Sequence, residues 1–374
     1  MERLIKSILI FDFFLNNRTQ IPSPGSSISL IQPITSGATN LVSNLQSRLV
    51  QLYTGTVEHL WICDESDGFS QEICEQLQQK YSQKNIKILL AKPENGSNLA
   101  GKIQKMNVGC WEATGAILVF IDDDIALPSQ GLRQLISPLQ DPEIGAVFGL
   151  ACGVSYENFW SGMMSSFVNV NALMNYVPLT YFLAPYTITG HFFAVRQADF
   201  EKVGGFWDMG HRIDDDHELA RRLNKAGLTL KQSAVCYQVN NQMADFRAFH
   251  RQMKRWFVFP KKFMTPFLSA RQQLVSGLVG SGILLPSLIL LCNIFFPSFN
   301  HLYCLAYTAL AALAGYNVCF AQNPFRKFVS WLFVLPVVFL LPFYVVWGLF
   351  FADNKVYWRG QKLAINADGT YAVV

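Results

Sequence analysis

Residues 116–128 have the sequence AILVFIDDDIALP, an apolar run that ends in three adjacent aspartates. Six apolar residues without alternation are typical of a strand that is buried on both faces of a parallel sheet. Three carboxylates at the end of such a strand repel one another unless a cation lies among them. In an extended chain Asp122 and Asp124 point to the same side, so both can bind one hard divalent ion. The alternative, a solvated acidic turn, is disfavoured by the apolar run and by Pro128.

Strand and helix patterns alternate on the N-terminal side of this run. Strands are expected at residues 28–33, 57–63 and 86–91, and helices at 40–53, 71–81 and 99–113. This alternation predicts an α/β fold with an open sheet that has helices on both faces. In such sheets ligands bind beyond the carboxyl ends of the strands, and Asp64 and Asp67 also follow a strand end. Taken alone, these two acids are explained as the N-cap of the next helix.

Two further polar clusters follow in the sequence. Residues 214–218 are DDDHE and precede a helical pattern, and a helix N-terminus explains one acid rather than four. One member of this cluster in a dry site can act as a general base, with a pKa set by its neighbours. His217 has no second histidine at metal-binding spacing and is expected to be an ordinary helix residue. Gln252 and Arg255 share a helical face beside Trp256, which suits phosphate binding or a basic helix on a membrane.

Charged residues are concentrated in the first part of the chain. Of the 374 residues 51% are hydrophobic and 15% are charged, whereas a soluble chain carries about 25% charged residues. Residues 272–325 and 328–352 contain no Asp, Glu, Lys or Arg, which predicts transmembrane helices at 274–295, 302–320 and 328–351. This composition excludes disorder, collagen and a disulfide-stapled secreted domain. The net charge of +4 is too small to indicate nucleic acid as a partner.

Taken in order, the clusters at 64–67, 122–124, 214–216 and 252–256 resemble the D, DxD, (E)D and QxxRW motifs of glycosyltransferase family 2. The resemblance covers roughly residues 27–256 and is closest to the ceramide glucosyltransferases (family 21) and their bacterial relatives. Further similar stretches are residues 61–64, Lys105 with Asn107, 189–191, 203–206, and 358–360 at the end of a three-helix tail. The resemblance implies a GT-A (Rossmann-like) open mixed sheet flanked by helices, followed by a three-helix transmembrane region.

The resemblance also implies how the donor is bound. Asp64 and Asp67 would hold the uracil and ribose of a UDP-sugar, and Lys105 would lie near the nucleotide. Asp122 and Asp124 would bind Mg²⁺ or Mn²⁺ on the diphosphate, and the sequence does not separate these two metals.

For the acceptor side, the resemblance assigns the base to Asp216, which would deprotonate the attacking hydroxyl. Asp215 stands where the family usually has glutamate, so the two aspartates could share that role. Gln252, Arg255 and Trp256 would steady the diphosphate leaving group and the acceptor.

The expected organisation has four parts: an amphipathic N-terminal segment (1–26), a cytosolic catalytic domain (27–271), a transmembrane region (272–352) and a C-terminal tail (353–374). The N-terminal segment has no convincing signal peptide and is too short to span, unlike that of the eukaryotic enzymes. It is expected to be either an interfacial or a core-docking helix. The charge-free segment 158–195 is expected either in the core or as an apolar floor at the membrane.

Localisation follows from the cysteines and the basic residues. Eight cysteines without CxxC spacing are typical of reduced side chains, and basic residues flank the predicted spanning segments. The sequence thus predicts a multi-pass integral membrane protein whose catalytic domain is cytosolic. Neither the side of the membrane on which the tail lies nor the oligomeric state follows from the sequence.

The expected reaction is an inverting transfer of a hexose, with glucose favoured, from a UDP-sugar to a hydroxyl of a membrane lipid such as ceramide or diacylglycerol. The product would be a β-glycolipid. One alternative is a processive polysaccharide synthase, although charge-free helices offer little to line a polar channel. A non-catalytic lipid-binding protein would require a broken acid cluster, and a metal-dependent phosphohydrolase would require a histidine-rich ligand set. The sequence specifies neither the sugar nor the lipid.

Overall fold

The computed structural model describes residues 2–17, 25–38, 40–92, 101–210, 212, 214–259, 264–322, 327–358, 361–366 and 370–373. These residues form two compact units whose segments alternate along the chain. The sheet unit consists of Asn17–Ala151 and Ala184–Asn240, and the helical unit of Met1–Asn16, Cys152–Leu183 and Asn241–Val374. Residues 359–360, which belong to one of the stretches noted above, lie outside the described residues.

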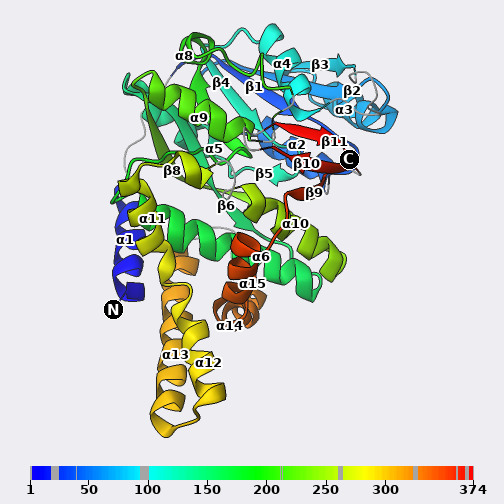
Figure 1. Ribbon diagram of the computed structural model, residues 1–374. Coiled ribbons are helices and arrows are strands. Elements are labelled where there is room, and N and C mark those ends of the chain that lie inside the picture. The colour runs from blue at the N-terminus through cyan, green and yellow to red at the C-terminus, as the bar shows by residue number, and fades with distance from the viewer. Residues whose placement is uncertain are drawn as a thin grey trace. The chain divides into compact units, whose positions relative to one another are not determined.

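The sheet unit is built on one mixed sheet, whose described strands have the order β3-β2-β1-β4-β7-β6-β8-β5 (Figure 1). The parallel strands are β1 (Ile28–Pro33), β2 (Val57–Asp64), β3 (Asn85–Ala91) and β4 (Ile117–Ile121). The antiparallel pairings involve β5 (Ile125–Ala126), β6 (Ile144–Gly153), β7 (Phe192–Arg196) and β8 (Thr229–Val239). The three predicted N-terminal strands and the buried apolar run are confirmed.

Helices cover both faces of this sheet, as predicted. They are α2 (Leu41–Leu49), α3 (Gly68–Lys80), α4 (Lys102–Glu112), α5 (Gly131–Ile136), α8 (Gln197–Lys202) and α9 (Asp215–Lys225), with a 3₁₀ turn at Ser137–Gln140. Successive residues of a strand point to opposite faces. In β4, Phe120 therefore packs in one buried cluster with Met106 of α4, while Val119 packs in another with Leu132 of α5.

The parallel pairing brings three strand ends to one edge of the sheet. β1 ends at Pro33, β2 at Asp64 and β4 at Ile121, and the register places Pro33 opposite Ile62 and Ile31 opposite Phe120. The loops that follow these ends therefore lie close together. The carboxylates that follow β2 and β4 thus belong to the same edge, as the alternation of strands and helices predicts.

The helical unit is assembled from helices and one small sheet. Its N-terminal and middle elements are α1 (Glu2–Asn17), α6 (Phe159–Asn171), a π-turn (Ala172–Tyr176), α7 (Val177–Leu179) and α10 (Phe246–Phe259). Its C-terminal elements are a 3₁₀ turn (Thr265–Phe267), α11 (Ala270–Ser281), α12 (Leu285–Phe295), α13 (Phe299–Gln322), a 3₁₀ turn (Phe328–Ser330), α14 (Trp331–Phe339), α15 (Leu341–Phe350), β9 (Lys355–Trp358), β10 (Gln361–Ile365) and β11 (Tyr371–Val373). Residues 161–169 of α6 are buried, so this part of the charge-free segment forms core.

The C-terminal helices differ from the three continuous spans that the sequence predicts. No single helix among the described residues is both long and apolar enough to cross a bilayer. Ala270–Ser281 with Leu285–Phe295, and Phe328–Phe339 with Leu341–Gly348, meet that requirement only as pairs, each bent by 51°. Pro286 and Pro342 follow the two breaks, and proline cannot donate the backbone hydrogen bond that would continue a helix.

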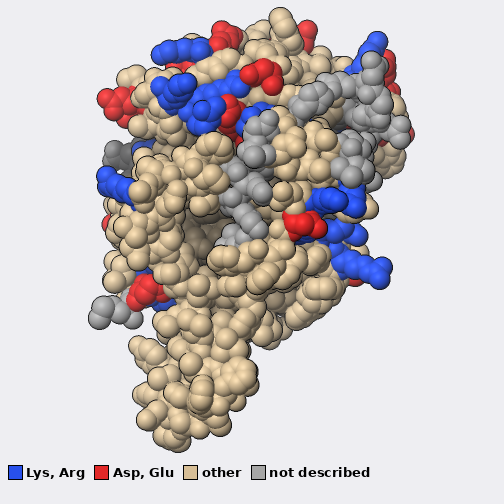
Figure 2. Space-filling model, viewed as in Figure 1, with Lys and Arg blue, Asp and Glu red and all other residues tan. Residues whose placement is uncertain are grey.

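Helices of the helical unit expose large apolar side chains. Phe299 of α13 is 83% exposed and Phe295 of α12 is 69% exposed. Figure 2 shows no charged residue on the visible surface of the α12–α13 hairpin. Helix α1 docks within the unit through buried Ile10, Phe13 and Phe14 and through a hydrogen bond from Lys6 Nζ to Val279 O at 2.7 Å. Its opposite face leaves apolar side chains exposed, namely Leu4, Ile5, Ile8, Phe11 and Leu15.

Candidate active site

The three aspartates that follow β4 have different partners. Asp122 Oδ1 lies 2.6 Å from Lys102 Nζ, and Asp123 Oδ2 accepts a hydrogen bond of 2.7 Å from the backbone N–H of Thr35. Asp124 Oδ1 is buried and has no hydrogen-bond partner among the described residues. Burial, and after it the neighbouring carboxylates, raise the pKa of Asp123 to about 7 and that of Asp124 to about 6. The three carboxylates therefore repel one another, as the sequence predicts.

A buried arginine that is not predicted from the sequence, Arg48, binds the backbone of the turn that follows β4. Arg48 of α2 is 1% exposed and donates hydrogen bonds to Gln32 Oε1 at 2.8 Å, to Ile125 O at 3.1 Å and to Asp122 O. Burial lowers its pKa to about 10, a shift that the three aspartates oppose. Its signal in the sequence is a cation between the core residues Leu45 and Leu49 of the helical pattern.

Asp64 forms an ion pair in the protein interior. Asp64 Oδ2 lies 2.5 Å from Lys105 Nζ, both side chains are fully buried, and Lys105 also donates to Ile34 O at 2.6 Å. Asp67 caps α3: Oδ1 accepts from Ser70 N at 3.2 Å, and Oδ2 accepts from Ser36 N at 2.8 Å.

These contacts give the first motif a clear structural role. Burial alone would raise the pKa of Asp67, but hydrogen bonds from Ser36 and Ser70 outweigh burial and lower it. Asp64, Asp67 and Lys105 together hold the loop after β1 against the start of α3. The N-cap interpretation is confirmed for Asp67, and the contacts of these three residues with a nucleotide stay a prediction.

The third acid cluster reaches the same edge through α9. Asp216 accepts hydrogen bonds from Gly190 N (Oδ2, 3.0 Å) and from His217 N (Oδ1, 2.8 Å). Burial, followed by the charge of Asp215, raises the pKa of Asp216 to about 7, and burial also raises that of Asp215. A carboxyl with a pKa near 7 in a desolvated place is suited to accept a proton at neutral pH.

Lys102 connects this cluster to Asp122. Besides its ion pair with Asp122, its ammonium donates to Gly190 O at 3.2 Å, and the N–H of the same Gly190 binds Asp216. Burial alone would lower the pKa of Lys102, but Asp122 and Asp215 outweigh burial and raise it. Lys105 is predicted from the sequence, whereas Lys102, three residues earlier on the same face of α4, is not.

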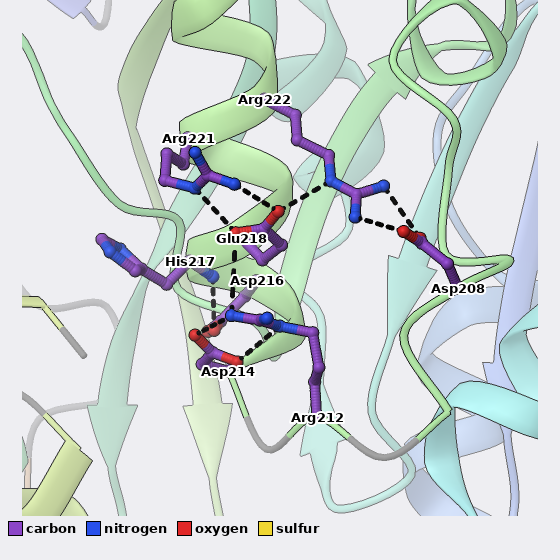
Figure 3. Close-up of polar contacts among 8 residues, drawn as sticks. All are labelled: Asp208, Arg212, Asp214, Asp216, His217, Glu218, Arg221 and Arg222. Atoms are coloured by element: carbon purple, nitrogen blue, oxygen red, sulfur yellow. Dashed lines mark hydrogen bonds and ion pairs between the residues drawn. The ribbon is translucent and has the colours of Figure 1, made fainter. Parts of the chain in front are cut away.

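The remaining acids of the DDDHE cluster are neutralised by arginines (Figure 3). Arg212 binds Asp214 through two hydrogen bonds of 3.0 and 2.8 Å. Glu218 accepts from Arg221 at 2.8 and 2.7 Å and from Arg222 at 2.8 Å. Burial alone would raise the pKa of Glu218, but these hydrogen bonds outweigh it and lower the pKa to about 2.

The cluster therefore divides into two pairs with different roles. Asp214 and Glu218 are paired with arginines and anchor the start of α9, although burial still raises the pKa of Asp214. Asp215 and Asp216 instead lie in the electrostatic field of Lys102. His217 is 4% exposed and lies within the first turn of α9, as an ordinary helix residue does.

The QxxRW residues lie in the helical unit. Gln252, Arg255 and Trp256 are all on α10, and Trp256 packs near Phe167 of α6, with ring centroids 6.1 Å apart. The adjacent Lys254 pairs with Asp353 at 2.6 Å. The participation of these three residues in the acidic site stays a prediction.

The acidic edge is suited to a hard divalent cation, although it is not a complete metal site. Among the described residues no group of three or more His, Cys, Asp or Glu side chains is arranged to hold a metal ion. However, Asp124 Oδ1 is a buried carboxylate oxygen without a hydrogen-bond donor, and it belongs to the same turn as Asp122. Two carboxylates with places left for a diphosphate fit Mg²⁺ or Mn²⁺, which keep ligands from water and substrate phosphates.

The chain is similar to proteins that are named as glycosyltransferases. A probable glycosyltransferase of Bacillus subtilis, YdaM, is 25% identical over 215 residues, which are 56% of this chain and 49% of that protein. The alignment thus spans about half the length of that relative. A mannosyltransferase from Pyrobaculum calidifontis, solved with GDP-Man and Mn²⁺, aligns over 89% of this chain and 94% of its own at 15% identity and a TM-score of 0.49. The model of glycosyl transferase family 21 matches residues 7–371, and the chain therefore belongs to this family of glycosyltransferases.

Proposed function

We propose that the protein transfers one hexose, glucose, from a UDP-sugar to a hydroxyl of a membrane lipid such as ceramide or diacylglycerol, with inversion, to give a β-glycolipid. Its membership of family 21 supports sugar transfer. The observation that carries the mechanism is the connection from Asp216 through Gly190 to Lys102 and Asp122. This connection supports the proposal that Asp216 is a proton acceptor close to the carboxylate of the DxD motif.

Asp216 is the base in this mechanism, and its surroundings suit the task. The N–H groups of Gly190 and His217 fix one oxygen each, so the carboxylate has a defined orientation. With a pKa of about 7 it is strong enough to take a proton from an attacking hydroxyl and weak enough to be ionised at neutral pH. The negative charge of Asp215 raises the pKa of Asp216 and so makes Asp216 a stronger base. Asp215 shares the role of the base in this way.

Asp122 and Asp124 would hold the divalent metal on the diphosphate of the donor. A bound Mg²⁺ or Mn²⁺ supplies electrostatic stabilisation of the charge that develops on the leaving diphosphate. Gln252, Arg255 and Trp256 would assist that group and the acceptor, because a guanidinium and an amide bind phosphate oxygens and an indole offers an apolar platform. Asp64, Asp67 and Lys105 would hold the loop against which the nucleoside binds.

A lipid acceptor and a bilayer are supported by the surface of the helical unit. Side chains such as Phe295 and Phe299 are 69% and 83% exposed on helices that carry no charged residue. Exposed apolar surface of this extent is unfavourable in water and marks an interaction with a membrane or a protein. We assign it to a multi-pass membrane region made of the bent pairs and α13, with the catalytic domain on the cytosolic side, where the flanking basic residues favour it.

The test is transfer from radiolabelled UDP-glucose, with Mg²⁺ or Mn²⁺, by membranes that contain the protein. Ceramide and diacylglycerol are added separately, the lipid products are resolved by chromatography, and Asp122→Ala serves as the inactive control. A single labelled glycolipid that digests with a β-glucosidase is the expected result. A labelled polymer would instead establish a processive polysaccharide synthase. If UDP-glucose, UDP-galactose and UDP-N-acetylglucosamine all gave no product, the catalytic assignment would fail.

A further inference from the structure

Lys102 and Lys105 are one turn apart on α4 and have different surroundings. Lys105 is fully buried and paired with Asp64, the last residue of β2. The side chain of Lys102 keeps 19% of its surface exposed, and its ammonium touches the Asp122 carboxylate at 2.6 Å, whose side chain is 21% exposed. Lys105 is therefore held in the interior, while Lys102 and Asp122 are mostly buried but keep part of their side-chain surface in contact with solvent.

Lys102 neutralises a large part of the negative charge of the carboxylates at this edge. Asp214 and Glu218 are paired with arginines, which leaves five carboxylates of the two acid clusters, at positions 122, 123, 124, 215 and 216. Arg48 binds the backbone oxygen of Asp122, and Asp123 is bound by the backbone N–H of Thr35. Among the described residues, Asp122 is the one of these five carboxylates that forms an ion pair, and its partner is Lys102.

Lys102 also binds one oxygen of the Asp122 carboxylate, which would hold the metal. Asp122 Oδ1 is engaged at 2.6 Å by an ammonium, a distance typical of a strong charge-assisted hydrogen bond. A divalent cation on either oxygen of Asp122 would lie within a few ångström of a like charge, and the interaction of charges at such separations is large inside a protein. The orphan oxygen of Asp124 on the same turn has no such competitor among the described residues.

We propose that Lys102 is the resident counter-ion of Asp122, which a divalent metal has to displace, so that Lys102 weakens metal binding to the free protein. The inference rests on the metal site of the proposed function, and it deepens that function by assigning a regulator of metal affinity. Displacement is open to the side chain because its other polar contact, Gly190 O at 3.2 Å, is a single hydrogen bond at the same edge. In the metal-free protein, Lys102 thereby neutralises the Asp122 carboxylate.

The test is the Mn²⁺ affinity of the purified full-length protein in detergent, measured by the electron paramagnetic resonance signal of free Mn²⁺ without nucleotide. Lys102→Met should bind Mn²⁺ at least about tenfold more tightly than the wild type, because it removes the competing charge. Lys102→Arg keeps the cation and should stay within about threefold. Lys225→Met, which removes a lysine from the last turn of α9, should leave the affinity unchanged.

A double-mutant cycle with Asp122→Asn makes the test specific. If Lys102 acts by competing for Asp122, the gain from Lys102→Met should disappear in the Asp122→Asn background. In addition, Mn²⁺ should raise the unfolding temperature of Lys102→Met more than that of the wild type. Should Lys102→Met not fold, Lys102→Gln provides the same comparison.

Unchanged or weaker Mn²⁺ binding by Lys102→Met, with wild-type binding intact, would overturn the inference and leave the proposed function standing. Equal gains with and without Asp122 would also overturn it. If neither the wild type nor Lys102→Met bound Mn²⁺, the inference and the metal site would fall together. A metal-affinity gain in a protein that transfers no sugar would support the inference while the proposed function failed.

Discussion

The backbone N–H of Gly190 donates to Asp216 Oδ2 at 3.0 Å, and a Cβ at position 190 would lie only 2.7 Å from that oxygen. No side chain can therefore be added at position 190 without moving the carboxylate. We expect Gly190→Ala to lower kcat/KM by about 100-fold, because small displacements of a catalytic group have effects of this size. Steady-state transfer assays with a soluble short-chain acceptor would measure this loss.

Gly68→Ala is the matched control for that change. Among the described residues, a Cβ at Gly68 meets no atom within 4 Å, and Gly68 lies at the start of α3, which follows the acidic motif at 64–67. This variant should keep wild-type kcat/KM. Wild-type transfer by Gly190→Ala would show that the position of Asp216 is not restricted by the close approach of residue 190.

The pH dependence follows from the Asp215–Asp216 pair. Burial and the charge of Asp215 raise the pKa of Asp216 to about 7, and a base acts only when it is deprotonated. The logarithm of kcat/KM should thus rise with a slope of about one as the pH approaches 7 from below, and level off above it. Asp215→Asn removes the like charge and should move this limb to lower pH. A flat profile between pH 5 and 8 in the wild type would contradict the assignment.

The buried pair of Asp64 and Lys105 predicts a large effect on stability. Both side chains are fully buried, so Lys105→Met leaves a carboxylate in the interior without its cation. The free energy of unfolding should fall by about 3–5 kcal/mol, as measured by denaturant titration in detergent. The double variant Asp64→Leu/Lys105→Met should recover much of this loss. Lys84 is an exposed lysine between α3 and β3, so Lys84→Met is the control. Equal stabilities of Lys105→Met and Lys84→Met would show that the pair does not stabilise the fold.

The contribution of Glu218 to the stability of the fold should depend on pH. Its pKa is lowered from 4.5 to about 2 by hydrogen bonds with Arg221 and Arg222, so the folded state favours the ionised form. The stabilisation is complete above the unfolded pKa of 4.5 and is lost as the pH falls towards 2. The unfolding temperature of Glu218→Gln should therefore be lower than that of the wild type at pH 7, and the gap should narrow below pH 4.5. The exposed Glu75→Gln should show little difference at any pH, and a constant gap for Glu218→Gln would contradict the account.

The sheet and its acidic edge were predictable because their signals are local. A continuous apolar run specifies a strand that is buried on both faces. Parallel pairing then brings Asp64 and Asp122 to the same edge of the sheet, independently of the conformation of the loops. The helix breaks before Pro286 and Pro342 could not be predicted from the sequence. Whether a helix continues through a proline depends on the contacts that replace the missing hydrogen bond, and these contacts are not visible in the local sequence.

Lys102 was not predictable from the same sequence. A lysine in the first turn of an expected helix is ordinarily solvated, and nothing local shows that this one reaches a strand end through the fold. The division of the DDDHE cluster was hidden for a similar reason. Arg221 and Arg222 lie one turn beyond Glu218 and could be paired with it from their spacing, whereas the Gly190 contact of Asp216 joins residues that are 26 positions apart.

The role of Asp216 as the base of an inverting transfer can be tested by comparing sugar transfer and UDP binding in purified Asp216→Asn. Transfer should fall by about 1,000-fold or more while the affinity for UDP with metal stays within about threefold, because the variant keeps the shape of the site and loses only the proton acceptor. Transfer at the wild-type rate by Asp216→Asn would show that Asp216 is not the base.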